Sequence, residues 1–323
     1  MSSFVAYLSA GSLISIGITV NAQAQAYPVK PVRIILPFTA GGGLDTVMRI
    51  LAQKVGDSTR QTVVIENRPG ASGNIAFEFV AKSEPDGYTL LASTPSIVTN
   101  PNIFSKVGYM VDDFTAISLL GKASLLVVVH PSLPARSISE LVKLAKAKPG
   151  AIRFSSAGTG SSNHLAVEML RMMVGIDMLH VPYKGGPQAL HDVISGQVEL
   201  TSLSFAETLP QVRANRVRAL AQTGDKRSPI ALDIPTVEQA GIKGYAASTW
   251  YVVFGQARMP SEAVSKIHSE FRRASLLTDV QERLKGAGIG EVIGSTPEQA
   301  AQFVREESVR WGKVIRAAGA KLD

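Results

Sequence analysis

The stretch VRIILPFTAGGGLD, residues 32–45, decides the fold class that the sequence predicts. Its first residues form an apolar run typical of a buried strand, and three glycines then precede a helical pattern. The apolar face of that helix is marked by Leu44, Val47, Met48, Leu51 and Val55. A helix start offers unpaired N–H groups and partial positive charge, and glycine lets the backbone approach a bound group closely. We therefore expect a strand–turn–helix unit that can hold a carboxylate.

A second stretch of this kind is SSAGTGSSN, residues 155–163, which follows a strand-like segment and also leads into a helical pattern. Each turn alone is weak evidence, because α/β domains also use glycine merely to fit a helix against a strand. Neither turn is a nucleotide loop: the second lacks a third glycine at the required spacing, and no Gly-Lys-Ser/Thr follows either. Two such turns facing each other would form an anion clamp.

Composition allows two domains of ordinary size in 323 residues. The chain is 45% hydrophobic and 18% charged, which favours a well-packed fold over disorder. Cysteine is absent, so disulfides, thiolate zinc sites and cysteine nucleophiles are excluded. The net charge of +7 is scattered and forms no basic stripe with interleaved aromatic residues. We therefore expect no nucleic-acid partner, and at most a mild attraction for anionic solutes.

The N-terminus predicts export. Residues 1–26 carry no charged side chain, contain a short apolar core at 13–20, and offer small residues at the −3 and −1 positions of a cut after Ala26. This pattern indicates a signal peptide over residues 1–26 and an exported protein. A membrane anchor is the alternative, but the apolar stretch is short and interrupted, and no later segment reaches ~18 apolar residues.

Strand and helix signals alternate along the rest of the chain, which predicts an open α/β sheet with right-handed crossovers. Expected strands are 32–38, 62–67, 89–93, 117–120, 125–130, 152–155, 178–182, 199–202, 218–222 and 249–254. Capping-box patterns begin helices at Ser137 and Thr296, the latter ending near Gly319. The order strand, glycine turn, helix, strand, turn occurs twice, and the later turns are 68–73 and 182–186. Two similar domains would place these turns beyond the carboxyl ends of the strands, where ligands bind.

Catalytic and metal-binding patterns are poorly supported. None of the five histidines lies in His-Glu-x-x-His, none is paired with a second ligand at helical spacing, and no Gly-x-Ser-x-Gly is present. We therefore expect no catalytic residue, metal or cofactor. Asp45 is interpreted as a helix cap, or as a group that orients water or receives a ligand ammonium. Thr159, Ser161 and Ser162 are candidates for helix caps or for carboxylate contacts.

The chain closely resembles the periplasmic solute receptors of tripartite tricarboxylate transporters, the Bug-type binding proteins. The resemblance spans nearly all of the chain after residue 26. It rests on the motifs at 27–31, 37–45, 66–74, 85–90, 156–165, 180–185, 218–221, 235–237 and 319–323.

The resemblance implies a two-lobed, type II Venus flytrap fold of the α/β class, each lobe a mostly parallel sheet flanked by helices, and no enzymatic activity. It implies that both glycine turns supply carboxylate contacts. The ligand-binding residues carried over are Phe38, Thr39, Ala40, Asp45, Ser156, Thr159, Gly160, Ser161, Ser162, His164 and Ser204, with Ser93 and Thr94 as weaker candidates. Thr39-Ala40 and the segment 202–206 depart from the family pattern near the pocket, so the solute's identity does not carry over.

We expect lobe 1 to comprise residues 27–122 and 247–323, and lobe 2 to comprise 123–246. The predicted function is to bind a small carboxylate by lobe closure and deliver it to the membrane permease subunits of such a transporter, as a monomer. One alternative is a sensing module that presents its closed form to a signalling receptor. Another, an exported α/β enzyme, would need a nucleophile–base pair that the sequence does not offer.

Overall fold

A computed structural model describes residues 27–317, so the predicted signal peptide and the predicted end of the last helix near Gly319 lie outside it. Within this range no helix is both long and apolar enough to cross a membrane. The strands are β1 (Val32–Leu36), β2 (Val63–Asn67), β3 (Thr89–Ser93), β4 (Phe114–Val129), β5 (Arg153–Ser156), β6 (Leu179–Pro182), β7 (Leu200–Ser204), β8 (Arg218–Gln222), β9 (Ser248–Gln256) and β10 (Ile289–Val292).

The α-helices are α1 (Gly43–Thr59), α2 (Asn74–Ala81), α3 (Ser96–Ile103), α4 (Ile138–Ala147), α5 (Ser162–Val174), α6 (Gly186–Ile194), α7 (Phe205–Arg213), α8 (Ser261–Ser275), α9 (Thr278–Gly286) and α10 (Pro297–Ala317). The predicted cap of α10 is confirmed: Thr296 and Gln299 exchange hydrogen bonds between side chain and backbone, at 3.0 and 3.3 Å. In α4, Ser137 Oγ accepts from the N–H of Glu140 as predicted.

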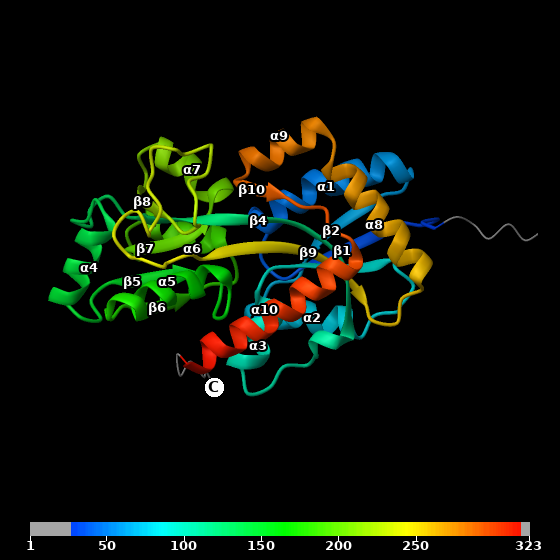
Figure 1. Cartoon of the computed structure of the whole chain (residues 1–323), viewed down its shortest axis with the longest axis horizontal. Coiled ribbons are helices and arrows are strands. Elements are labelled where there is room, and N and C mark those ends of the chain that lie inside the picture. Colours follow the sequence, from blue (N-terminus) through cyan, green and yellow to red (C-terminus); the bar gives the residue numbers. More distant parts are fainter. Residues whose placement is uncertain (1–26, 318–323) are drawn as a thin grey trace, which may run out of the picture.

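The strands form two lobes that share two long strands (Figure 1). The hydrogen-bonded order is β2-β1-β3-β9-β4-β7-β5-β6, and β8 and β10 each pair with β4. In the first lobe β1 is parallel to β2 and β3, and in the second β5 is parallel to β6 and β7. The shared strands β4 and β9 are antiparallel to their neighbours. The predicted two-lobed α/β fold is confirmed.

Strand β4 joins the lobes. Its residues up to Ser124 pair with β9, whereas those from Leu125 onward pair with β7 and β8. The expectation of separate strands at 117–120 and 125–130 was wrong, because residues 121–124 continue the ladder with β9. The short strand β10 was not expected.

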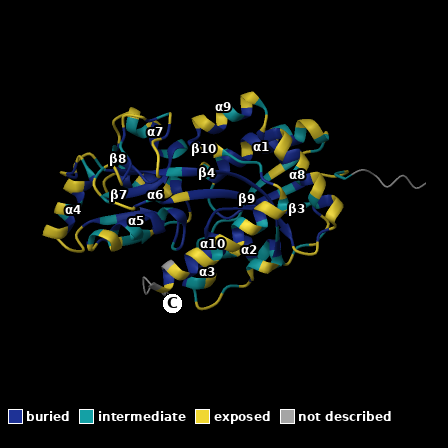
Figure 2. Ribbon diagram, viewed as in Figure 1, coloured by how far each residue is buried: buried dark blue, intermediate teal, exposed yellow. Residues whose placement is uncertain are grey.

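Each lobe buries apolar side chains on both faces of its sheet, as the dark strands in Figure 2 show. Adjacent residues of β1 illustrate this: Ile34 packs into the cluster beside α1 and α8, and Ile35 into the cluster beside α2 and α10. In β4, Leu125 and Leu126 likewise enter opposite clusters of the second lobe. Successive side chains of a strand point to opposite faces, so strands covered on both sides read as continuous apolar runs.

Gly121 allows β10 to approach β4. A Cβ at Gly121 would lie 2.5 Å from the backbone oxygen of Glu291 and 2.9 Å from Cγ2 of Ile289. We predict that Gly121→Ala lowers the free energy of unfolding by about 1–3 kcal/mol in urea denaturation, because the added methyl group overpacks this contact. Gly290→Ala is the control, since a Cβ there meets nothing within 4 Å. Equal effects of the two substitutions would contradict the steric explanation.

Candidate functional site

A cavity of about 40 Å³ lies between the lobes, at the ends of β1 and β7 and beside β9. It is lined by Leu36, Phe38, Thr39, Gly42, Gly43, Leu44, Asp45, Asn67, Thr94, Leu125, Ala157, Ser162, Asn163, Gly186, Ser204, Glu207, Thr249 and Tyr251. Of the thirteen predicted ligand-binding residues, the structure brings six to this cavity: Phe38, Thr39, Asp45, Thr94, Ser162 and Ser204.

Four helices begin at the cavity wall. Gly43, Ser162 and Gly186 are the first residues of α1, α5 and α6, and Ser204 directly precedes α7. Of these helices, α1, α6 and α7 have no side-chain hydrogen bond that caps their first turn. Their N–H groups therefore present partial positive charge to the cavity from both lobes. The predicted clamp thus contains more helix starts than the two that the sequence indicated.

Asp45 shapes the first glycine turn. Its carboxylate accepts hydrogen bonds from the N–H of Gly41 at 3.0 Å, from Arg49 at 2.8 and 3.0 Å, and from Nδ2 of Asn67 at 3.1 Å. Burial pushes the pKa of Asp45 upward, but these hydrogen bonds outweigh it and hold the pKa below its ordinary value. Asp45 does not cap α1, whose N-cap is Gly42. Its carboxylate is fully used in holding the turn.

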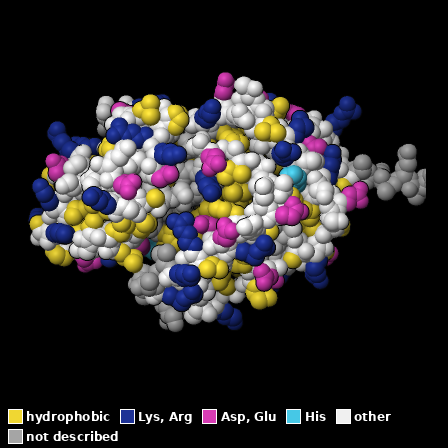
Figure 3. Space-filling view, in the orientation of Figure 1, with side chains coloured by type: hydrophobic (Ala, Val, Ile, Leu, Met, Phe, Trp, Pro, Cys, Tyr) yellow, Lys and Arg dark blue, Asp and Glu magenta, His cyan; other side chains and the backbone are white. Residues whose placement is uncertain are grey.

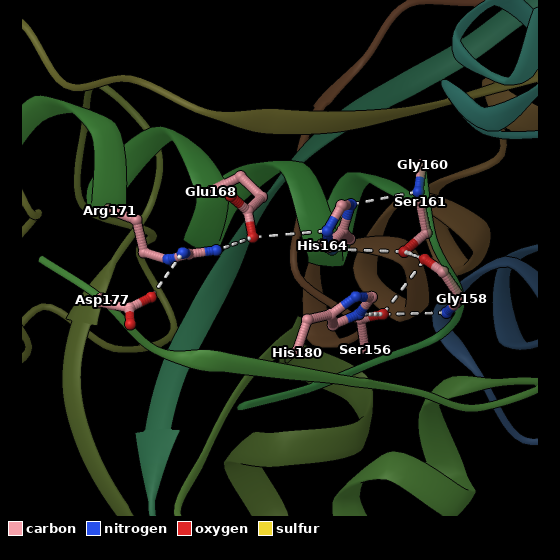
Figure 4. Close-up of polar contacts among 9 residues, drawn as sticks. All are labelled: Ser156, Gly158, Gly160, Ser161, His164, Glu168, Arg171, Asp177 and His180. Atoms are coloured by element: carbon pink, nitrogen blue, oxygen red, sulfur yellow. Dashed lines mark hydrogen bonds and ion pairs between the residues drawn. The ribbon is translucent and has the colours of Figure 1, made fainter. Parts of the chain in front are cut away.

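The second glycine turn is held by its own polar side chains (Figure 4). Ser156 Oγ accepts from the N–H of Gly158 at 3.1 Å and lies 2.7 Å from Nε2 of His180. Ser161 caps α5 by accepting from the N–H of His164 at 3.3 Å, and the N–H of Gly160 donates to Nδ1 of His164 at 3.2 Å. These predicted contact residues do not line the cavity; instead they fix the shape of the turn.

The imidazole rings of His164, which is buried, and of His180, which is half-buried, extend this network. The rings of His164 and His180 lie 4.0 Å apart, and burial together with the neighbouring His164 lowers the pKa of His180 to about 3. His180 is therefore neutral near pH 7. His164 Nε2 lies 3.5 Å from Glu168, which also pairs with Arg171 at 2.7 Å. The network anchors the start of α5.

The remaining predicted residues lie elsewhere. Ala40 is exposed, and Ser93 is buried with its hydroxyl donating to the backbone oxygen of Thr94 at 3.2 Å. Thr159 lines a separate surface hollow with Ser72 and Lys184. None of these three contributes to the cavity wall.

Glu207 is the main cavity residue that the sequence reasoning missed. Its Oε2 accepts from Ser204 Oγ at 2.5 Å, and its Oε1 is buried without a hydrogen-bond partner. A Cβ at Gly186 would overlap Oε1, and a Cβ at Gly42 would lie 3.7 Å from it. Burial raises the pKa of the Glu207 carboxyl to about 7, against the lowering effect of hydrogen bonds from Ser204 and Gly43. The sequence did contain a signal for Glu207: it is an acidic residue in the first turn of a helix that directly follows a strand.

Other missed residues are Asn67, Gly186, Thr249 and Tyr251. The Gly185-Gly186 turn was noted as part of the duplication but was not assigned to the site. Tyr251 lies on β9. The Tyr251 hydroxyl is buried. Burial raises the pKa of this hydroxyl above its ordinary value, and the nearby Glu207 carboxyl raises it further.

Unsatisfied oxygens gather at the cavity. Among the described residues, buried side-chain oxygens without a hydrogen-bond partner include Thr39 Oγ1, Glu207 Oε1 and Thr249 Oγ1, and all three belong to lining residues. Buried polar groups are normally hydrogen-bonded, so such a concentration indicates a place where another molecule supplies the partners.

Positively charged side chains do not line the cavity. On the face seen in Figure 3, Lys and Arg are scattered and interspersed with Asp and Glu. In the part of the chain that the structure describes, no group of three or more His, Asp or Glu side chains is placed to hold a metal ion. The attraction for anions at the cavity therefore comes from helix starts and not from side-chain charge.

The fold and the cavity between its lobes define a periplasmic solute-binding protein. The family model for the tripartite tricarboxylate transporter family receptor, TctC, matches residues 47–320. The chain is 33% identical to protein BugT of Bordetella pertussis, over 95% of this chain and 94% of that protein. The chain belongs to the TctC, or Bug-type, receptor family.

Solved structures agree with this assignment. The structure of Rpa4515 from R. palustris with adipate has a TM-score of 0.88 and 33% identity, and covers 91% of this chain and 98% of that one. MatC from Rhodopseudomonas palustris with bound malate has a TM-score of 0.84 and 29% identity, covering 90% and 100%. Members of the family are solute-binding proteins, which also implies a periplasmic location.

We predict that Asp45→Asn lowers the free energy of unfolding by about 1–3 kcal/mol at pH 7, because it weakens the hydrogen bonds that hold the first turn. An Asp with a lowered folded-state pKa stabilises the fold above its unfolded value of 3.8, and this contribution is lost as the pH falls further. The deficit should therefore shrink below about pH 4. Asp57→Asn, at an exposed position of the same helix, is the control for urea unfolding across pH. A deficit independent of pH would contradict this role.

For Glu207 we predict the opposite pH dependence. Its folded-state pKa of about 7 exceeds the unfolded value of 4.5, so the wild-type protein loses stability as the pH rises between these values. Relative to Glu207→Gln, the wild-type free energy of unfolding should fall by up to about 3 kcal/mol from pH 4.5 to 8. The measurement uses urea unfolding of protein freed of solute by refolding. Glu262→Gln, on the exposed start of α8, should leave the wild-type pH profile unchanged. Parallel profiles for wild type and Glu207→Gln would contradict a buried carboxyl.

Proposed function

We propose that this protein is an exported receptor that closes its lobes around a small carboxylate and delivers it to the membrane permease subunits of a tripartite tricarboxylate transporter. The observation that carries the proposal is the cavity between the lobes, where helix starts from both lobes converge beside unpartnered oxygens. The neighbours with adipate and malate support a carboxylate as the solute class. We propose that the receptor acts as a monomer and without catalysis.

Backbone N–H groups would hold the solute. Hydrogen bonds from N–H groups and hydroxyls to an ionised carboxylate are charge-assisted, which offsets the loss of water around the anion. The first turn of α1 contributes from one lobe, and the first turns of α5 and α6 contribute from the other. A micromolar solute requires a net binding free energy of about −8 kcal/mol, which a few such contacts can provide.

We propose Phe38, Thr39, Thr94, Ser162 and Ser204 as the predicted residues that touch the solute directly. Asp45, Ser156, Gly160, Ser161 and His164 would act through the shape of the two turns. Ala40, Ser93 and Thr159 have no place in this proposal, since other positions form the wall.

Closure would be driven by contacts that form only when the lobes meet. Thr99 Oγ1 on α3 donates to the backbone oxygen of Gly160 at 2.7 Å, and the N–H of Thr39 donates to the oxygen of Lys184 at 3.4 Å. We propose that the chain crosses between lobes at 122–123 in β4 and near 247 before β9, as the expected lobe boundaries imply. Rotation about these two segments would open the cavity and change the surface offered to the permease.

We predict that Gly43→Ala weakens carboxylate binding at least ~10-fold, or about 1.4 kcal/mol. A Cβ at Gly43 would lie 2.7 Å from Cβ of Ser204 and 3.0 Å from the hydroxyl of Tyr251, so the lobes could not meet. The measurement is calorimetric titration of refolded protein with adipate, malate, succinate and citrate. Gly286→Ala, where a Cβ meets nothing within 4 Å, controls for a general effect on helices. Binding to none of these acids, or wild-type affinity in Gly43→Ala, would contradict the proposed site.

A further inference from the structure

The cavity wall contains one carboxyl group that has no cationic partner among the described residues. Its ionisable acidic side chains are Asp45 and Glu207, and no Lys, Arg or His lines it. Asp45 is compensated by Arg49, Gly41 and Asn67. Glu207 receives a hydrogen bond from Ser204 on Oε2, while Oε1 is buried and unpartnered.

Glu207 lies among the same helix starts that would receive a solute anion. Its Oε1 touches Gly186, the first residue of α6, and lies near Gly42, the N-cap residue of α1, so it sits between a helix start of each lobe at the cavity wall. A solute carboxylate bound there would meet a second carboxylate at close range in a site with little water. Two like charges in such a site repel strongly unless a proton or a cation lies between them.

We propose that the solute carries a cationic nitrogen in addition to its carboxylate, and that the Glu207 carboxylate receives this nitrogen. This inference rests on the proposed function and specifies its solute as an aminocarboxylate. The helix starts would hold the solute's carboxylate, and Glu207 Oε1 would accept a hydrogen bond from its ammonium group. Each charge of the zwitterion then has a partner, and the buried oxygen is no longer unsatisfied.

A proton is the other partner that could neutralise this carboxylate. A proton from solution could neutralise Glu207, and the resulting acid would donate a hydrogen bond to a plain carboxylate. That arrangement satisfies the charges, but it needs a proton for each solute bound. Proton exchange on binding therefore separates the two arrangements.

The experiment uses compounds that differ only by an amino group: propanoate and 3-aminopropanoate, butanoate and 4-aminobutanoate, and succinate and aspartate. Calorimetric titration of refolded protein at pH 8 should show at least one amino compound binding ~10-fold or more tightly than its plain partner. Glu207→Gln should remove this preference by lowering the affinity for the amino compound at least ~10-fold, while the affinity for the plain partner stays the same or rises, because the like charge is gone. Glu262→Gln should leave both affinities unchanged.

A second measurement needs no variant. Titrations of the wild-type protein at pH 7 in buffers of different ionisation enthalpy report proton exchange on binding. Binding of the amino compound should release protons, because its ammonium favours ionised Glu207, whereas a plain carboxylate should take protons up.

The outcomes distinguish this inference from the proposed function. If plain carboxylates bind as tightly as their amino partners, or if Glu207→Gln keeps the amino preference, the inference is overturned and the carboxylate receptor stands. Proton uptake with the amino compound would also overturn it. If none of the six compounds binds, and neither adipate nor malate does, the proposed function fails and the inference fails with it.

Discussion

The site depends on unpaired backbone N–H groups that reach one cavity from both lobes. Side-chain substitutions do not remove these backbone groups, and burying them without a hydrogen-bond partner costs free energy. An anion between the lobes satisfies them, and so does water when the lobes separate. A solute anion can satisfy donors of both lobes only in the closed form, so it binds that form more tightly and favours closure. Because the donors belong to the main chain, the fold itself provides the binding site, and side chains adjust its specificity.

Two hydrogen-bond networks keep the donors in place. In the first lobe the Asp45 carboxylate ties the glycine turn to α1 and to Asn67 at the end of β2. In the second lobe Ser156, Ser161 and His164 tie the other turn to α5 and to β6. Both networks rely on buried polar groups with several partners, which hold a loop more rigidly than apolar packing alone. They explain why polar residues at these turns are needed even where they do not face the solute.

The sequence predicted the α/β fold and the first glycine turn because both depend on local patterns: apolar runs, consecutive glycines and helical spacing. The six lining residues among the expected contacts came instead from the resemblance to the Bug-type receptors. The sequence reasoning did not foresee that Ser156 and His164 contact His180 of β6, because that contact forms only when distant segments of the lobe come together. Glu207 and Gly186 were missed because their proximity to α1 arises from contact between the lobes, which no short motif encodes. The continuity of β4 was missed because the polar and small residues Gly-Lys-Ala-Ser at 121–124 resemble a turn, yet β9 pairs with them.

Glu207 gives the cavity a charge balance that helix starts alone would not have. The N–H groups at the starts of α1, α5 and α6 favour a bound anion. The buried Glu207 carboxylate disfavours it unless a cation or a proton is bound together with the anion. This opposition can make the receptor selective without any basic side chain in the wall.

The most direct test of the account is a crystal structure of the protein with the carboxylate that binds most tightly. The account predicts a solute carboxylate in the cavity, with its oxygens about 2.7–3.2 Å from backbone nitrogens of the first turn of α1 and from donors of the second lobe. A solute bound to one lobe only, or at an outer surface, would contradict it.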